Sequence, residues 1–200
     1  MKFITLEGVD GAGKSSHIEF IADAVRTKAA HVIVTREPGG TDLAERLRQT
    51  ILNDAMTPIQ ETLLVFAARA DHVARVIKPA LTSGQWVICD RFTDATLAYQ
   101  GAGHGVSADL IRRLADAVHP GLKPHRTLVF DCPYDVAAAR LAKAGRKLDR
   151  FEREDRAFFE RVRGAYLALA KAEPDRIQVL DASRSAGEVR DAIKRALETL

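Results

Sequence analysis

Short runs of apolar residues alternate along this chain with longer stretches in which apolar residues recur every three or four positions. The short runs predict five buried strands, at Phe3–Leu6, Val32–Thr35, Trp86–Cys89, Thr127–Asp131 and Ile177–Leu180. The longer stretches predict helices over 14–27, 42–53, 59–82, 107–117, 134–143, 155–172 and 186–199. Because strands that alternate with helices pair in parallel and are covered on both faces, the pattern predicts an α/β fold with a five-stranded parallel sheet.

Length and composition add limits to this picture. The 200 residues contain no repeat and no linker, so we expect one domain that spans residues 1–200. The net charge of +3 is too small to suggest a surface for nucleic acid. With no leader and no long apolar span, we expect a cytoplasmic protein without a membrane partner. Cys89 and Cys132 each end an apolar run, which favours buried thiols over a disulfide or a metal site.

The first predicted strand leads directly into a glycine-rich segment. Gly8-Val9-Asp10-Gly11-Ala12-Gly13-Lys14-Ser15 matches the phosphate-loop pattern G-x-x-x-x-G-K-[ST], with a strand before it and a helix after it. The glycines let backbone N–H groups turn toward a phosphate chain, and the helix N-terminus adds partial positive charge. We therefore expect these eight residues to bind a nucleoside triphosphate, with Lys14 at its β- and γ-phosphates and the Ser15 hydroxyl on Mg²⁺.

An acidic residue and an arginine follow the third predicted strand. Asp90 ends this strand, where a carboxylate can hold the hydration shell of Mg²⁺ next to Ser15. Arg91 comes next and is directed at the same pocket, although a structural salt bridge of the two is the simpler alternative. The chain has no Asn-Lys-x-Asp guanine motif, which argues against a GTPase, and Leu81–Gln85 only faintly matches the signature of ABC-type ATPases.

Three further segments are candidates for the ligand site. Thr35–Gly40 and Gly101–Gly105 are predicted loops near the carboxyl ends of strands, where open parallel sheets bind their ligands. The third, Lys143–Arg156, is dominated by charge and lies between two predicted helices. Taken alone it could be a solvated helical face.

Five segments occur in one order along nearly the whole chain: Leu6–Ser15, Thr35–Gly40, Phe66–Arg69, Asp90–Gly101 and Leu148–Glu152. In this the sequence resembles the thymidylate kinases, specifically those of bacteria. The resemblance implies the P-loop nucleoside monophosphate kinase fold, with strand order 2-3-1-4-5. It also implies transfer of the γ-phosphoryl group of ATP, with Mg²⁺, to thymidine monophosphate (dTMP). Members of the family are homodimers, which suggests self-association through an apolar helix face within 59–80 or 107–117.

The resemblance assigns the base of dTMP to residues on two helical segments. Arg69 and Gln100 are expected to hydrogen-bond the thymine edge, with Thr96 as a lesser contact. The family usually has an aromatic residue four positions before the arginine, whereas this chain has Val65 there and Phe66 one position later. Successive helical residues point about 100° apart, so both cannot face the pocket equally. We favour Val65 as the wall of the thymine pocket and Phe66 as a core residue.

The resemblance also assigns the sugar and the monophosphate. Arg48 is expected to hold the phosphate of dTMP, and Tyr99 to lie where a 2′-hydroxyl would project, which favours deoxyribose. Asp10 would bind the 3′-hydroxyl or a metal-bound water, and Glu37 would line the same pocket.

Cations carry the expected catalysis, because two anions must meet in this reaction. Lys14 and Arg91 supply two positive groups, and Arg91 also binds substrate. The phosphate loop contains no arginine, whereas some family members have one there. We therefore predict that the charged segment, at about residues 143–156, is a lid that closes over ATP and delivers arginines, with Arg150 preferred, then Arg146, then Arg153.

Two alternatives stay open at the level of sequence. One is another nucleoside monophosphate kinase of the same fold, and the other is a non-catalytic nucleotide-binding regulator. An assay with a panel of monophosphates separates them.

Overall fold

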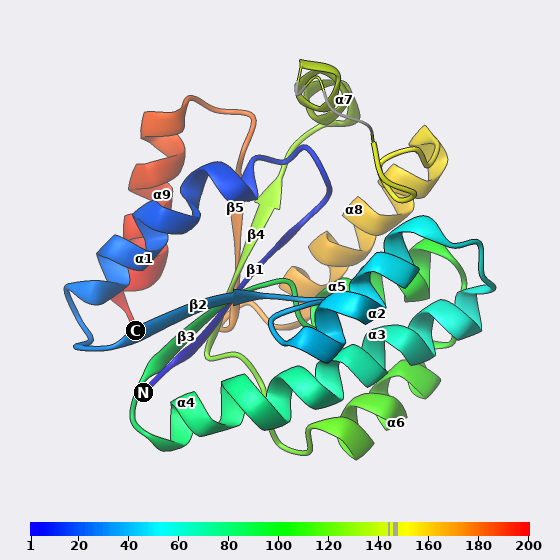
Figure 1. The fold of residues 1–200 in the computed structure, drawn as a ribbon. Coiled ribbons are helices and arrows are strands. Elements are labelled where there is room, and N and C mark those ends of the chain that lie inside the picture. The colour runs from blue at the N-terminus through cyan, green and yellow to red at the C-terminus, as the bar shows by residue number, and fades with distance from the viewer. Residues whose placement is uncertain (144, 146–147) are drawn as a thin grey trace.

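A parallel sheet of five strands forms the centre of the protein. The computed structural model describes residues 1–143, 145 and 148–200. The strands are β1 (Phe3–Gly8), β2 (Val32–Arg36), β3 (Trp86–Asp90), β4 (Arg126–Asp131) and β5 (Ile177–Asp181). Their order is β2-β3-β1-β4-β5, and every neighbouring pair is parallel (Figure 1). The predicted fold class, strands and strand order are confirmed.

Helices connect the strands. The α-helices of the described chain are α1 (Ile18–Arg26), α2 (Asp42–Asn53), α3 (Pro58–His72), α4 (Lys78–Thr82), α5 (Thr93–Thr96), α6 (Ala108–Val118), α7 (Tyr134–Lys143), α8 (Arg156–Ala172) and α9 (Ala186–Glu198). A 3₁₀ turn, η1 (Lys14–His17), precedes α1, and the π-helical segments η2 (Val73–Ile77) and η3 (Leu97–Gly103) continue α3 and α5. The single helix predicted at 59–82 corresponds to three consecutive helical segments, α3, η2 and α4.

The central strand β1 sends alternate side chains to two helical layers. Phe3 packs with η2 and α4, and Glu7 contacts α8 through a hydrogen bond, so these elements cover one face. Figure 1 shows α1 and α9 together on the other side of the sheet, where they pack beneath Ile4 and Leu6. All six residues of β1 are buried, as expected for a strand in the middle of a sheet covered on both faces, and they include the polar side chains of Thr5 and Glu7.

Local capping residues set where the helices begin. The Thr57 hydroxyl accepts a hydrogen bond from the backbone N–H of Gln60, and the Gln60 side-chain oxygen accepts one from the backbone N–H of Thr57. Pro58 occupies the first turn of α3. Ser185 and Glu188 form the same reciprocal cap before α9. These short motifs explain why the predicted helix boundaries agree with the structure.

The predicted loop at Gly101–Gly105 is wrong in its first half. Helix α5 runs on into η3, which ends only at Gly103. The glycines serve close packing here, because a Cβ on Gly103 would lie 2.5 Å from the ring of Phe158 and one on Gly101 would lie 3.4 Å from Ile111. They let η3 lie tightly against α8 and α6, so glycine marks a contact between helices at this point and not a turn.

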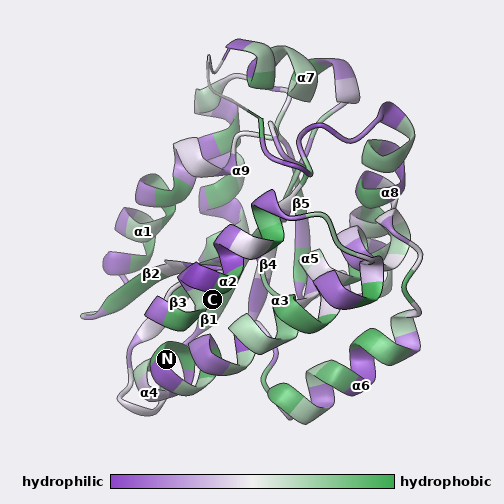
Figure 2. Cartoon of the chain, turned by 45° about the vertical axis from the view of Figure 1, so that its right-hand side comes forward, coloured by the Kyte–Doolittle hydropathy of each residue, from purple (hydrophilic) through white to green (hydrophobic). Residues whose placement is uncertain are grey.

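None of the described helices is both long enough and apolar enough to cross a membrane. Figure 2 shows hydrophilic and hydrophobic positions mixed along individual helices such as α1, α6 and α9. This mixture is typical of helices with one face on a core and one in water.

Candidate active site

The carboxyl ends of β1, β2 and β3 bring three segments to one edge of the sheet. The phosphate loop leaves β1, the segment from Glu37 leaves β2, and Arg91 leaves β3. The backbone is crowded in the loop: a Cβ on Gly8 would lie 2.4 Å from the carbonyl oxygen of Phe130, and one on Gly11 would lie 2.5 Å from that of Ala137. Both glycines have positive φ values, 130° and 78°. The close approach of the loop to β4 and α7 therefore requires glycine at both positions.

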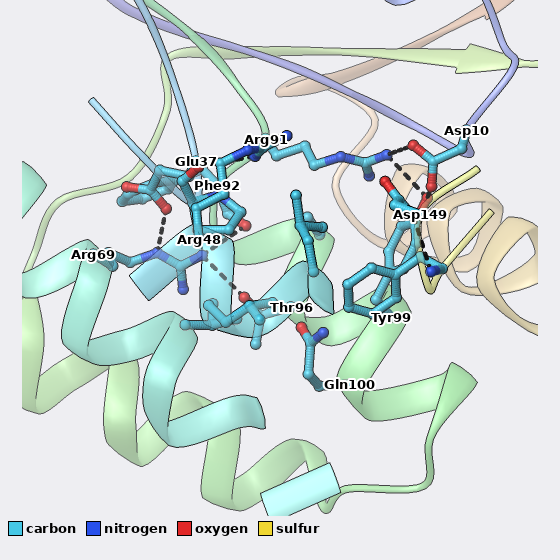
Figure 3. A pocket seen from close by; sticks show the side chains of 16 residues that line it. Asp10, Glu37, Arg48, Arg69, Arg91, Phe92, Thr96, Tyr99, Gln100 and Asp149 are labelled. Carbon is cyan, nitrogen blue, oxygen red and sulfur yellow. Dashed lines mark hydrogen bonds and ion pairs between the residues drawn. The ribbon is translucent and has the colours of Figure 1, made fainter. Parts of the chain in front are cut away.

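Two cavities meet at this edge. The inner cavity lies between the sheet edge, α2, α3 and η3, and its walls include Asp10, Glu37, Pro38, Arg48, Val65, Arg69, Arg91, Thr96, Tyr99, Gln100, Asp149 and Phe151 (Figure 3). The loop groove runs along the phosphate loop and includes Asp10–His17, Asp90, Arg91, Arg140, Ala182 and Arg184. Asp10, Glu37, Arg48, Leu52, Arg91 and Asp149 line both. A group bound in one cavity therefore faces a group bound in the other across these six side chains.

Lys14 is a buried cation in the loop groove. Its Nζ donates to the carbonyl oxygens of Gly8, at 3.0 Å, and Val9, at 3.4 Å. Burial and then Arg91 lower the pKa of Lys14 below its ordinary value of 10.5, and attraction to Asp90 opposes this shift. The side chain of Lys14 therefore folds back onto the backbone of the phosphate loop and lines the groove.

Arg91 lies between the two cavities in a strained backbone conformation. Its φ of 70° is the one positive value at a non-glycine residue in the described ranges. The guanidinium donates to Asp10 at 2.6 Å and to the hydroxyl of Tyr99 at 3.0 Å, and it lies 4.6 Å from the centre of the Tyr99 ring. Burial alone would lower the pKa of Arg91, but Asp10, Tyr99, Tyr166 and Asp90 together outweigh it, and the pKa lies well above its usual range. Arg91 is therefore a permanent cation that its neighbours hold in one orientation.

The contacts of Asp10 explain why this phosphate loop contains an acidic residue. It accepts hydrogen bonds from Arg91 and, at 2.8 Å, from the hydroxyl of Tyr99. Burial raises the pKa of Asp10. Arg91, then Lys14, and the hydrogen bonds from Tyr99 and Arg91 lower it by more in total, so the net shift is downward. Asp10 is a carboxylate at neutral pH that anchors Arg91 and Tyr99, and it also lines both cavities.

Glu7 lies beneath Arg91 and is fully buried. Its two carboxyl oxygens accept hydrogen bonds from the backbone N–H of Phe92, at 2.7 Å, and from the hydroxyl of Tyr166, at 2.9 Å. The same Tyr166 hydroxyl accepts from Arg91 at 3.3 Å. Burial, and then the charge of Asp94, raise the pKa of Glu7 from 4.5 to about 7.

Replacing Glu7 with glutamine is expected to remove part of the pH dependence of stability. Between pH 4.5 and about 7 the native carboxyl binds a proton that the unfolded chain has released, so this contribution to stability is full below pH 4.5 and is lost as the pH rises through about 7. The loss is roughly 3 kcal/mol for a shift of this size. Urea unfolding of wild type and Glu7→Gln at several pH values measures it as a difference between the two proteins. Glu198→Gln, an exposed control, should follow the wild type; the same pH slope in Glu7→Gln would contradict the assignment.

Asp90 fits a role beside a hydrated cation. Its Oδ1 is buried without a hydrogen-bond partner among the described residues, and it lines the loop groove together with Ser15. A carboxylate oxygen and a hydroxyl are ligands or hydration-shell partners that Mg²⁺ prefers. The donor set at this point of the groove therefore fits the predicted metal.

Arg69 forms the floor of the inner cavity and is held by three partners. Its Nε donates to Glu37 at 2.6 Å, and its Nη2 donates to Thr96 at 2.9 Å and to the carbonyl oxygen of Phe92 at 3.1 Å. Its Nη1 is buried and has no partner in the described part of the chain. A fixed guanidinium with one unused N–H group can donate a hydrogen bond to a ligand in the cavity.

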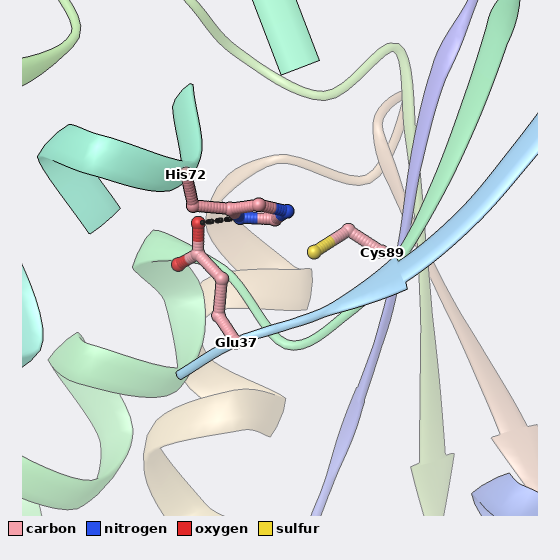
Figure 4. Close-up of side chains that lie close together, drawn as sticks. All are labelled: Glu37, His72 and Cys89. Carbon is pink, nitrogen blue, oxygen red and sulfur yellow. Dashed lines mark hydrogen bonds and ion pairs between the residues drawn. The ribbon is translucent and has the colours of Figure 1, made fainter. Parts of the chain in front are cut away.

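Glu37 has a second partner, which closes a small buried cluster (Figure 4). The Nδ1 of His72 lies 2.9 Å from Glu37, and its Nε2 lies 2.7 Å from the hydroxyl of Thr35. The ligand atoms of Glu37, His72 and Cys89 lie within 4.8 Å of one another, as in a metal site. However, Arg69 and His72 already engage the carboxylate, and burial raises the pKa of Cys89 well above 9.0, so the thiol stays neutral. The cluster is better explained as a support for Arg69 than as a metal centre.

Val65 and Phe66 point to different sides of α3. Val65 lines the inner cavity, whereas Phe66 packs in a separate buried cluster with Val106, Ile111 and Ala115. The arrangement is the one favoured from helical geometry. Contact of Val65 with a base stays a prediction.

The structure brings the predicted lid arginines to different places. Arg150 contacts the buried carboxylate of Glu61 at 2.5 Å and the carbonyl oxygen of Ile51 at 2.9 Å, beside the inner cavity that Ile51 lines. Arg153 is exposed and donates to the carbonyl oxygen of Asp149. Arg146 lies outside the described residues. The charge of Arg150 is paired here with the buried carboxylate of Glu61, and a place of Arg150 over the transferring phosphate stays a prediction.

Comparisons with known proteins agree with this geometry. A family model described as thymidylate kinase matches residues 6–193. The thymidylate kinase of Bordetella petrii is 55% identical over 199 residues, which cover 100% of this chain and 96% of that protein. That of Cupriavidus metallidurans is 54% identical, with 100% and 98% covered. A crystal structure of thymidylate kinase from Ehrlichia chaffeensis superposes with a TM-score of 0.80 at 32% identity, over 98% of each chain. The chain belongs to the thymidylate kinase family.

Sequence reasoning missed several residues that shape the site of this thymidylate kinase family member. Arg140 donates to the carbonyl oxygens of Ala12, at 3.3 Å, and Ala182, at 2.8 Å, and so lies across the loop groove. Asp149 lines both cavities, and burial raises its pKa. Asp149 stands in a segment that carried the resemblance and could have been singled out. Arg140 is one of many charged residues on amphipathic helices, and no local pattern distinguishes it.

Proposed function

We propose that this chain transfers the γ-phosphoryl group of ATP to dTMP, giving thymidine diphosphate and ADP, with Mg²⁺. Its membership of the thymidylate kinase family supports the reaction. The observation that carries the assignment to this site is the pair of cavities that meet at Arg91, Arg48 and Asp10. A donor nucleotide in the loop groove and an acceptor in the inner cavity would present their phosphates to each other there.

The loop groove offers the donor side of the reaction. The residues Gly8 to Ser15 would surround the phosphates of ATP, with Lys14 as the cation at the β- and γ-phosphates. Ser15 and Asp90 would hold Mg²⁺ and its waters, which fits the unpartnered Oδ1 of Asp90. When bound, the metal would neutralise negative charge on the phosphates.

The inner cavity offers the acceptor side. Arg48, which is tied to the carbonyl oxygen of Pro38 at 2.9 Å, would hold the phosphate of dTMP. Tyr99 would lie against the deoxyribose, where its ring leaves no place for a 2′-hydroxyl. Arg69 and Gln100 would hydrogen-bond the thymine edge, and Thr96 would contact the base as well as hold Arg69.

Catalysis in this arrangement is electrostatic. Arg91 lies where the two phosphates would meet, and Asp10 and Tyr99 fix its guanidinium before any substrate binds. A donor that is already oriented stabilises the charge of the transition state without reorganisation. The segment 143–156 would act as the lid, with Arg150, Arg146 and Arg153 as its candidate arginines for ATP.

Self-association of two copies is part of the proposal. Ile59 and Leu63 lie one turn apart on α3 and are 46% and 51% exposed. Exposed apolar residues on adjacent turns favour a contact between proteins. We propose a homodimer that uses this face and acts in the cytoplasm, where ATP is available.

The test is an assay of ADP release with ATP, Mg²⁺ and each nucleoside monophosphate in turn. We expect dTMP to be the preferred acceptor, with weaker use of deoxyuridine monophosphate because a single methyl group contributes only about 1–3 kcal/mol of discrimination. Preference for another monophosphate would overturn the substrate assignment. Binding of ATP without turnover of any acceptor would overturn the catalytic one.

A further inference from the structure

Glu61 is a buried carboxylate behind the inner cavity for which the proposed reaction has no direct use. It lies on α3, and 1% of its surface is exposed. One oxygen accepts a hydrogen bond from the side-chain amide of Gln100 at 2.6 Å, and the other accepts from Arg150 at 2.5 Å. Through these contacts Glu61 links η3, α3 and the segment that precedes α8.

The contact with Glu61 determines which end of the Gln100 amide faces the cavity. Glu61 forms an ion pair with Arg150, and a carboxylate can only accept hydrogen bonds. The amide NH₂ of Gln100 must therefore point to Glu61, which leaves the carbonyl oxygen Oε1 for the cavity that Gln100 lines. Without such a partner, the two ends of a glutamine amide could exchange.

An acceptor at Gln100 and a donor at Arg69 make a pattern that distinguishes pyrimidines. Thymine presents an N3–H donor next to the O4 acceptor, which pairs with the Gln100 oxygen and the unused Nη1–H of Arg69. Cytosine presents the reverse, an N3 acceptor next to an N4 amino group. Its N3 acceptor would face the acceptor oxygen of Gln100, and its N4 donor would face the N–H donor of Arg69. Sites built on such hydrogen bonds reject mismatched ligands strongly, because buried polar groups are left unpaired.

We propose that Glu61 is a positioning residue that sets thymine-over-cytosine specificity by fixing the orientation of the Gln100 amide. The inference rests on the proposed function, since it takes dTMP as the ligand of the inner cavity. Arg150 supplies the opposite charge that compensates the burial of the Glu61 carboxylate. While this ion pair is formed, Arg150 acts on the base pocket.

The test compares binding of dTMP and deoxycytidine monophosphate (dCMP) to wild type and Glu61→Gln by calorimetry. A glutamine at 61 can donate as well as accept, so Gln100 becomes free to turn its NH₂ toward N3 of cytosine. We expect the ratio of the two affinities to fall by about tenfold or more, the effect of one such hydrogen bond. We also expect dCMP to bind more tightly than it does to wild type. A general loosening of the pocket would weaken both ligands and would overturn the proposal.

Two further variants make the result specific. In Gln100→Met, which has no amide to orient, adding Glu61→Gln should leave the ratio unchanged. Glu19→Gln, an exposed change of the same charge on α1, should leave both affinities unchanged. Arg150 is partly exposed and keeps its contact with Ile51, so Glu61→Gln does not strand a buried cation. Wild-type turnover of dTMP, measured in the same series, tests the proposed function separately, because the binding ratio does not depend on catalysis.

Discussion

Replacing Arg91 with methionine is expected to lower kcat for dTMP by roughly 10³-fold, with a smaller change in KM, as for other arginines that stabilise a transferring phosphoryl group. The guanidinium of Arg91 lies between the two cavities, and Asp10, Tyr99 and Tyr166 hold it there. Methionine fills a similar volume but carries no charge to the transition state. Steady-state kinetics with ATP and dTMP measure the effect.

The backbone conformation at Arg91 determines which variants are suitable controls for this prediction. Any side chain at this position must adopt the left-handed φ of 70°, so Arg91→Met and Arg91→Lys carry the same strain and differ in charge. Lysine keeps the charge but not the two-pronged contact with Asp10 and Tyr99, so it should recover part of the loss. Arg26→Met, on the exposed side of α1, should behave as wild type. If Arg91→Met keeps kcat within about tenfold of wild type, or about 1.4 kcal/mol, Arg91 is not the catalytic cation.

Local patterns in the sequence were sufficient to predict the fold. The strands, their order and the long helices are as expected, because apolar periodicity reports burial. The prediction failed at Gly101–Gly103, where glycine permits close contact of two helices. The glycine pattern is the same in a turn and in a tight helix contact, so only the tertiary structure separates them.

The candidate site was predictable where a motif fixes its own geometry. The phosphate loop follows β1, Asp90 ends β3 and Arg91 comes directly after it, and parallel strands bring the two ends together. The partners of Arg150 were not predictable in this way. Its charge suggested a place over ATP, but Glu61 lies 89 positions earlier in the chain and was not recognised as a buried carboxylate that needs a cation. Pairings of this kind depend on which helices become neighbours, and charge along the sequence does not specify that.

Replacing Lys14 with methionine is expected to lower kcat by roughly 10³-fold, the upper end of the range for one preorganised donor. The same change is expected to stabilise the ligand-free protein. Burial and Arg91 lower the pKa of Lys14, so the unfolded chain binds its proton more tightly than the native protein does. The charge therefore opposes folding at neutral pH, and wild-type stability rises with pH as the lysine loses its proton below 10.5. Methionine removes this penalty, because it never carries the charge.

Thermal unfolding with and without ATP separates the loss of chemistry from a loss of structure. Without ligand, Lys14→Met should unfold at the same temperature as wild type or a higher one at pH 7. With ATP and Mg²⁺, wild type should gain stability in proportion to the logarithm of ligand concentration over Kd, and the variant should gain much less. A lower unfolding temperature for the ligand-free variant would mean that the contacts of Nζ with Gly8 and Val9 outweigh the cost of the buried charge. Lys14 would then stabilise the empty loop as well as bind phosphate, and the expected conflict between stability and activity at this position would not exist.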